Sequence, residues 1–124
     1  VLDCLDGYFA YLSALAAGQD LPSALNFGPT PETKPFTVAE LANALQIAMG
    51  RPAAFQLDQN DGPHEMPKLS IDPARAMDVL GWRPRLDASS MLRLTAEWYA
   101  AEAAGQDMAA MTDAQIAQYQ DLRP

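Results

Sequence analysis

The sequence predicts an α+β fold that is mostly helical, with four or five helices and two or three short strands. Apolar residues recur at steps of three and four over most of the 124 residues, which is the spacing of one face of a helix. Only a few short apolar runs suit strands. So little sheet cannot form a doubly wound domain alone, and we therefore expect a single domain that belongs to a larger fold.

The first predicted helix covers residues 2–17. Its apolar stripe, which we expect to face the core, consists of Leu2, Leu5, Phe9, Leu12 and Ala16. Gly7 costs this helix about 1 kcal/mol relative to Ala, which indicates that another segment approaches closely there. Asp3 and Asp6 suit the positive end of the helix dipole, and we interpret them so rather than as a catalytic carboxylate pair. Cys4 is interpreted as a small core residue.

Residues 24–29, "ALNFGP", form a short apolar run that stops at a Gly-Pro turn, which favours a buried strand. A helix over residues 37–49 begins with the capping box "TVAE". Residues 53–57 and 68–71 are two further candidates for short strands. Each of these strands would need a partner, and that partner could lie in another part of a longer chain.

A third helix follows the sequence "DPARAMDVLGW". Asp72 is its predicted N-cap, Pro73 its first residue and Gly81 the residue that ends it. Trp82 should then pack against the helix.

The fourth predicted helix covers residues 88–104 and ends at Gly105. Met91, Thr95 and Trp98 lie on one stripe of this helix, and Leu92, Ala96 and Tyr99 lie beside it. We interpret Trp98 and Tyr99 as core residues. A final short helix, which holds Ile116 and Tyr119, should start at the capping box "TDAQ", residues 112–115.

Composition excludes several classes of protein. The net charge of −8 argues against a nucleic-acid binder, although residues 68–93 hold five basic against three acidic side chains. No apolar run reaches the ~20 residues of a membrane helix. One Cys and one His are too few for a structural zinc site. The chain begins at Val1 without a secretory signal, so we expect a cytoplasmic protein, and a fragment of a longer one.

Catalytic and cofactor-binding motifs are missing from the sequence. The seven glycines form no Gly-x-Gly-x-x-Gly cradle, and there is no Tyr-x-x-x-Lys pair, so we predict no catalytic, cofactor-binding or metal-binding residue. The only histidine, His64, stands beside Glu65 in "GPHEMPKLSID". These two residues could act as an acid/base couple, could bind a ligand, or could lie in a loop and have no chemical role. A loop carboxylate can accept two hydroxyls at once, which suits a ribose diol.

The stretch "HEMPKLSIDPARAMDVLGWRPRLD…TAEWY" resembles the C-terminal signature of the extended short-chain dehydrogenase/reductase family. "VLDCLDGYFAYLSAL", "LNFGP" and "GQDMAAMTDAQIAQY" are most similar to the branch that dehydrates CDP-glucose. The resemblance implies that residues 1–124 are the nucleotide-sugar-binding lobe of an NAD-dependent lyase. It also implies that NAD and the catalytic groups belong to a missing N-terminal Rossmann domain, without which this fragment is inactive.

The same resemblance assigns roles to the His-Glu pair. Glu65 precedes Asp72 by seven residues, as does the family's acidic or histidine residue that approaches the nucleotide ribose, and His64 stands next to it. Gly62 replaces the family's phosphate-binding arginine, so no phosphate contact is carried over.

Two alternatives remain open. One is another nucleotide-sugar epimerase or dehydratase of the family. The other is a non-catalytic, acidic helical module that binds a protein, for which Met108 and Met111 would offer adaptable contacts. Self-association of the isolated lobe is possible in either case.

Overall fold

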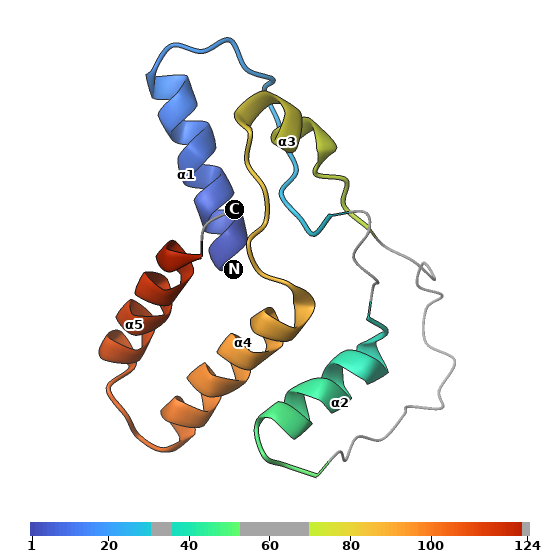
Figure 1. The fold of residues 1–124 in the computed structure, drawn as a ribbon, viewed down its shortest axis with the longest axis vertical. Helices are drawn as coiled ribbons and strands as arrows, with labels where there is room; N and C mark the ends of the chain where they lie inside the picture. Colours follow the sequence, from blue (N-terminus) through green and yellow to red (C-terminus); the bar gives the residue numbers. More distant parts are fainter. Residues whose placement is uncertain (31–35, 53–69, 123–124) are drawn as a thin grey trace.

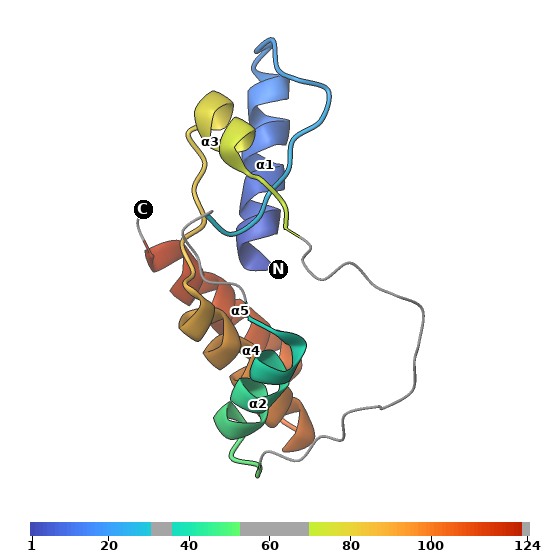
Figure 2. The same ribbon diagram turned by 90° about the vertical axis from the view of Figure 1, so that its right-hand side faces the viewer.

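The computed structural model describes residues 1–30, 36–52 and 70–122, and these ranges contain five α-helices. The helices are α1 (Leu2–Ala16), α2 (Val38–Ala48), α3 (Ala74–Leu80), α4 (Ala88–Ala103) and α5 (Met108–Asp121). They form two groups (Figure 1): α1 packs against α3, and α4 packs against both α2 and α5. A quarter turn of the molecule shows the second group as a layer below the first (Figure 2).

The predicted strands are wrong for the described residues, where the fold is all-α. Residues 24–29 form neither helix nor strand, and the same holds for residues 70 and 71. Strands are stable only when neighbours pair their backbone groups. Here Phe27 instead places its ring among the side chains of α1 and the segment after α3. The candidate strand at 53–57 and the first half of the one at 68–71 lie outside the described residues.

The core between α1 and α3 is built on Phe27, Ala76 and Trp82, all of which are buried. The Phe27 ring meets the Trp82 ring edge-on, with centroids 5.1 Å apart. Cys4 packs against this cluster, which confirms its interpretation as a core residue. Trp82 therefore does pack after α3, as predicted.

α1 turns an unexpected face toward this core. Gly7 is buried, and a methyl group there would overlap the Phe27 ring, so the predicted close approach is confirmed. The predicted core stripe instead faces outward: Phe9 is 67% exposed and Leu12 59%. Because the ring needs the flat surface that glycine leaves, α1 buries the Gly7 side and exposes the larger residues.

The start of α2 follows the prediction. The Thr37 hydroxyl accepts a hydrogen bond from the Glu40 amide at 3.1 Å, and the Glu40 carboxylate accepts one from the Thr37 amide at 2.8 Å. The capping box is therefore confirmed.

α3 begins one residue later than predicted. Pro73 rather than Asp72 is the N-cap, but the Asp72 carboxylate still accepts a hydrogen bond from the Ala74 amide at 2.9 Å. Gly81 ends the helix in the left-handed conformation, with φ 65°, and its amide donates to the Met77 carbonyl. This glycine cap was predicted correctly.

The buried face of α4 agrees with the prediction only in part. Ala96 is buried, together with Leu94 and Ala101, and Trp98 is half-buried, whereas Met91 and Tyr99 are 42% and 50% exposed. Several stripes of α4 are apolar enough to serve as a core face, and the choice between them depends on contacts with α2 and α5.

The last helix starts earlier than predicted, at Met108, because the Asp107 carboxylate accepts hydrogen bonds from the Ala109 and Ala110 amides. Thr112 therefore lies inside α5, where its hydroxyl accepts a hydrogen bond from the Trp98 indole at 3.0 Å. Tyr119 of this helix is buried, whereas Ile116 is 38% exposed. None of the described helices combines the length and apolar character needed to cross a membrane.

Candidate functional site

The predicted ligand-binding pair, His64 and Glu65, lies outside the described residues, as does Gly62. Contact of this pair with a nucleotide sugar therefore stays a prediction. The structure does describe the residues that follow it, from Ser70 into α3.

The segment before α3 is held against the segment that follows Phe27. A methyl group on Gly28 would stand 3.5 Å from Cβ of Ile71 and 3.7 Å from its carbonyl oxygen, so the two backbones lie side by side. Pro73 and Ala76 are fully buried immediately beyond this contact. This packing anchors the start of α3 against the segment that follows Phe27.

The basic stretch at residues 68–93 is partly neutralised by ion pairs. A guanidinium nitrogen of Arg85 lies 3.3 Å from Asp6, and one of Arg93 lies 2.9 Å from Glu97. Arg75 and Arg83 are exposed and have no ion pair within the described residues, while Lys68 lies outside them. Of the described basic residues in this stretch, Arg75 and Arg83 are therefore the two that could bind an anion.

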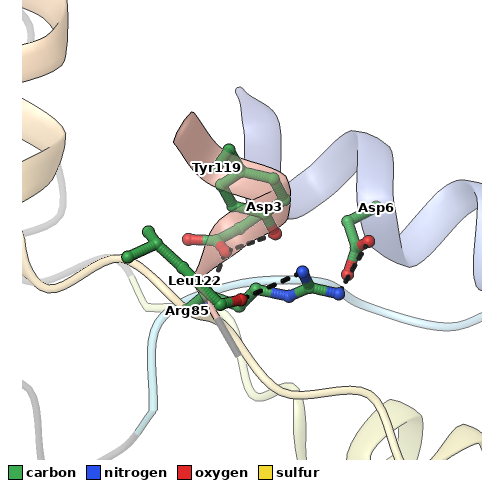
Figure 3. A network of polar contacts seen from close by, with 5 residues as sticks. All are labelled: Asp3, Asp6, Arg85, Tyr119 and Leu122. Atoms are coloured by element: carbon green, nitrogen blue, oxygen red, sulfur yellow. Dashed lines mark hydrogen bonds and ion pairs between the residues drawn. The ribbon is translucent and has the colours of Figure 1, made fainter. Parts of the chain in front are cut away.

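The sequence did not predict the polar cluster that joins the two ends of the chain (Figure 3). One oxygen of Asp3 accepts hydrogen bonds from the Arg85 amide and the Tyr119 hydroxyl, both at 2.8 Å. Its second oxygen accepts from the Leu86 amide at 3.3 Å. Asp3 thus bonds to groups 82, 83 and 116 residues away, so a local pattern could not reveal it.

Arg85 completes the cluster. Its guanidinium donates to the Asp6 carboxylate at 3.3 Å and to the Leu122 carbonyl at 3.1 Å. The same group lies over the Tyr119 ring, 5.1 Å from its centroid. Asp3 and Asp6 are therefore partners in tertiary contacts, beyond the helix-dipole role that we predicted.

The chemistry of this cluster suits a structural link. Burial, together with the hydrogen bond to Asp3, raises the pKa of the Tyr119 hydroxyl above its usual value of 10.0. The phenol therefore stays protonated and acts as a donor. Both oxygens of Asp3 already accept hydrogen bonds. Both groups therefore serve as partners in tertiary hydrogen bonds.

The described residues do not suit a dinucleotide cofactor. A dinucleotide pyrophosphate is held by a glycine-rich loop that leads into a helix N-terminus. The glycines with positive φ, by contrast, follow the carboxyl ends of helices: Gly18, Gly50, Gly81 and Gly105. A cofactor of this type would have to be held by other residues.

Comparison with known proteins connects the chain to enzymes of nucleotide sugars. It is 31% identical over 120 residues, 96% of its length, to the CDP-glucose 4,6-dehydratase of Salmonella typhimurium strain LT2, of which the match covers 33%. It is 34% identical over 101 residues, 81% of its length, to a UDP-glucose 4-epimerase of Rhizobium leguminosarum bv. trifolii, of which the match covers 29%. These likenesses confirm the resemblance to the C-terminal domain of the extended short-chain dehydrogenase/reductase family.

The chain spans about a third of the length of these curated relatives of the short-chain dehydrogenase/reductase family. No family model and no solved structure matches the sequence.

Proposed function

We propose that this chain is the nucleotide-sugar-binding domain of a longer, NAD-dependent 4,6-dehydratase that acts on CDP-glucose. The observation that carries the proposal is the similarity to the Salmonella dehydratase over 96% of the chain. The names of both relatives refer to a nucleoside diphosphate glucose as the substrate. A nucleoside diphosphate glucose is therefore well supported as the class of ligand, whereas a preference for CDP-glucose over UDP-glucose has less support.

In this proposal the chain binds and orients the substrate. The Glu65 carboxylate accepts hydrogen bonds from the two ribose hydroxyls, and His64 contacts the same nucleotide. NAD, which supplies hydride transfer at the hexose, is held by the part of the enzyme outside this chain. The chain alone is then inactive.

An epimerase of the same family is the second candidate, because the similarity to the Rhizobium enzyme covers 81% of the chain. Both candidates bind the same class of ligand, so they differ only in the reaction of the longer enzyme. Incubating the full gene product with CDP-glucose and UDP-glucose distinguishes them. Loss of water from the sugar supports a dehydratase, and an inverted C4 hydroxyl supports an epimerase.

Binding can be tested on the chain itself. We expect CDP-glucose to shift backbone amide resonances between residues 60 and 72 in NMR titrations. Glu65→Gln should weaken binding at least about tenfold, since hydrogen bonds to a charged group contribute roughly 1.5–3 kcal/mol each and 1.4 kcal/mol is a factor of ten.

Glu97→Gln is the control for this titration, because Glu97 lies on α4 and pairs only with Arg93 among the described residues. Unchanged affinity in Glu65→Gln would refute the assigned role. Absence of any nucleotide-dependent shift at millimolar concentration would favour the alternative of a protein-binding module.

A further inference from the structure

The outward face of α1 is an apolar surface that the described residues leave largely uncovered, although the Tyr8 ring also meets the Phe27 ring edge-on, with centroids 5.4 Å apart. It is made of residues 42–67% exposed, which recur at helical spacing along one side of the helix: Leu5, Tyr8, Phe9, Leu12 and Leu15. In Figure 1, α1 lies at the edge of the molecule with α3 on one side only. We call these five residues the outer stripe.

The opposite side of α1 is also apolar, since Cys4, Gly7 and Tyr11 pack toward Phe27 and Trp82. No charged residue occurs between Gly7 and Gln19. Apart from Asp3, Asp6 and Ser13, α1 is therefore apolar on two sides, and such a helix is normally buried in protein or in a membrane. A 15-residue helix is shorter than the ~20 residues that span a bilayer, so a protein surface is the better cover.

Within the described residues, the exposed apolar side chains elsewhere are more scattered. Val38, Leu41 and Ile47 on α2 are 85%, 39% and 64% exposed, but Glu40 and Asn43 interrupt them. Scattered apolar side chains are common on protein surfaces and need no partner. The outer stripe differs because its residues adjoin along almost the whole helix.

We infer that the outer stripe is the surface through which this chain docks on the rest of its own enzyme. The inference rests on the proposed function. The relatives are about three times as long as the chain, so a large protein surface is available outside it. That surface is covalently linked to α1, which raises its effective concentration. A second copy of the chain fits less well, because each copy carries a net charge of −8 and the two would repel.

The chemistry of the docking site follows from the stripe. The receiving surface must be apolar and free of buried charge, because the stripe offers no carboxylate or ammonium group to pair with one. Tyr8 and Phe9 are its aromatic members, and aromatic side chains often supply much of the energy of an interface. They should be the anchors of the contact.

Hydroxyl-radical footprinting tests the inference by comparing the 124-residue chain with the full gene product that contains it. We expect the oxidation rates of Tyr8 and Phe9 to fall severalfold in the full product. Tyr99 on α4 is the matched control, because it is 50% exposed and Tyr8 is 52% exposed. Its oxidation rate should be equal in both proteins. Equal oxidation of Tyr8 in the two proteins would overturn the docking surface.

A variant sharpens the test. Phe9→Asp should keep the helical circular dichroism of the isolated chain but restore the oxidation of Tyr8 in the full product, whereas Tyr99→Asp should not. If Tyr8 stays protected in Phe9→Asp, the inference is wrong. Protection of Tyr8 that grows with the concentration of the isolated chain would assign the stripe to a second copy instead.

These outcomes separate the inference from the proposed function. If Tyr8 is protected but no nucleotide sugar binds, the docking surface is supported and the proposed function is contradicted. If a nucleotide sugar binds but Tyr8 is not protected, the proposed function is supported and the docking surface is contradicted. A gene product no longer than this chain would contradict both.

Discussion

Gly7 lies at the closest approach between α1 and the segment that follows it. The Phe27 ring occupies the space where a side chain at this position would be, and the ring is in turn packed edge-on against Tyr8 and Trp82. A helix interior normally disfavours glycine. The glycine is therefore explained by the space that the ring needs.

We expect Gly7→Ala to destabilise the protein despite the better helix propensity of alanine. Overpacking of a core costs up to about 3 kcal/mol, and the gain in propensity is about 1 kcal/mol, so the net loss should be about 2 kcal/mol. Urea unfolding followed by circular dichroism measures it. A Phe27→Leu background should reduce the loss; an equal loss in both backgrounds would show that Phe27 is not the cause.

Asp87 shows how a single side chain can start an element. Its carboxylate accepts a hydrogen bond from the Ser90 amide at 2.7 Å, and this bond lowers the pKa of the carboxyl below its usual value. The contact involves only residues close in sequence. Caps of this kind are the part of a structure that a sequence shows most directly.

At the scale of elements, α3 combines a short length with strong end signals. It has only seven residues, fewer than isolated helices need to be stable, so its stability depends on caps and packing. Asp72 satisfies an amide at its start and Gly81 ends it with positive φ. Ala76 and the preceding Pro73 supply the burial.

Gly81→Ala should therefore destabilise the end of α3 by about 1 kcal/mol, because a side chain disfavours the left-handed conformation. Gly28→Ala is the control: a methyl group there meets Ile71 at ordinary contact distance, and Gly28 does not have positive φ. Thermal unfolding should show a lower Tm for Gly81→Ala and little change for Gly28→Ala. The reverse order would contradict this account of the cap.

At the scale of the whole molecule, the Asp3 cluster ties α1, the segment before α4 and α5 together. The termini of the described chain are thereby joined through side chains on both ends (Figure 3). Tyr119 is buried on α5 and Asp3 lies in the first turn of α1. The two helix groups are held partly by this hydrogen bond.

Tyr119→Phe should lower the free energy of unfolding by about 1.5 kcal/mol near pH 7, because a hydrogen bond to a charged acceptor is lost. The pKa of Tyr119 is raised by folding, so the hydroxyl stabilises the protein below pH ~10 and this contribution declines as the pH rises further. The difference between wild type and variant should therefore shrink above pH ~10.

Unfolding at several pH values measures this difference. Tyr99→Phe is the control, because Tyr99 is half exposed on α4 and should show no such effect. A difference that is constant with pH, or that grows above pH 10, would mean that the hydroxyl does not act as described.

Several local features of this protein were predictable from the sequence, although the Asp107 cap that starts α5 was not. The capping box of Thr37 and Glu40, the glycine end of α3 and the need for space at Gly7 were all recognised. Each depends on residues a few positions apart, or on the intrinsic preference of one residue type. The family resemblance was likewise carried by motifs within the chain.

The tertiary structure alone decided which faces pack. α1 and α4 each carry more than one apolar stripe, and spacing cannot say which of them meets a neighbour. Residues 24–29 are apolar enough for a strand, but strand formation also needs a paired backbone, which the described residues do not supply. Asp3 accepts hydrogen bonds from Arg85 and Tyr119, which lie 82 and 116 residues away in the sequence. Which face of a helix packs, and which partners a side chain bonds to, depend on long-range contacts. The free energy of such contacts is gained only when distant segments of the chain meet.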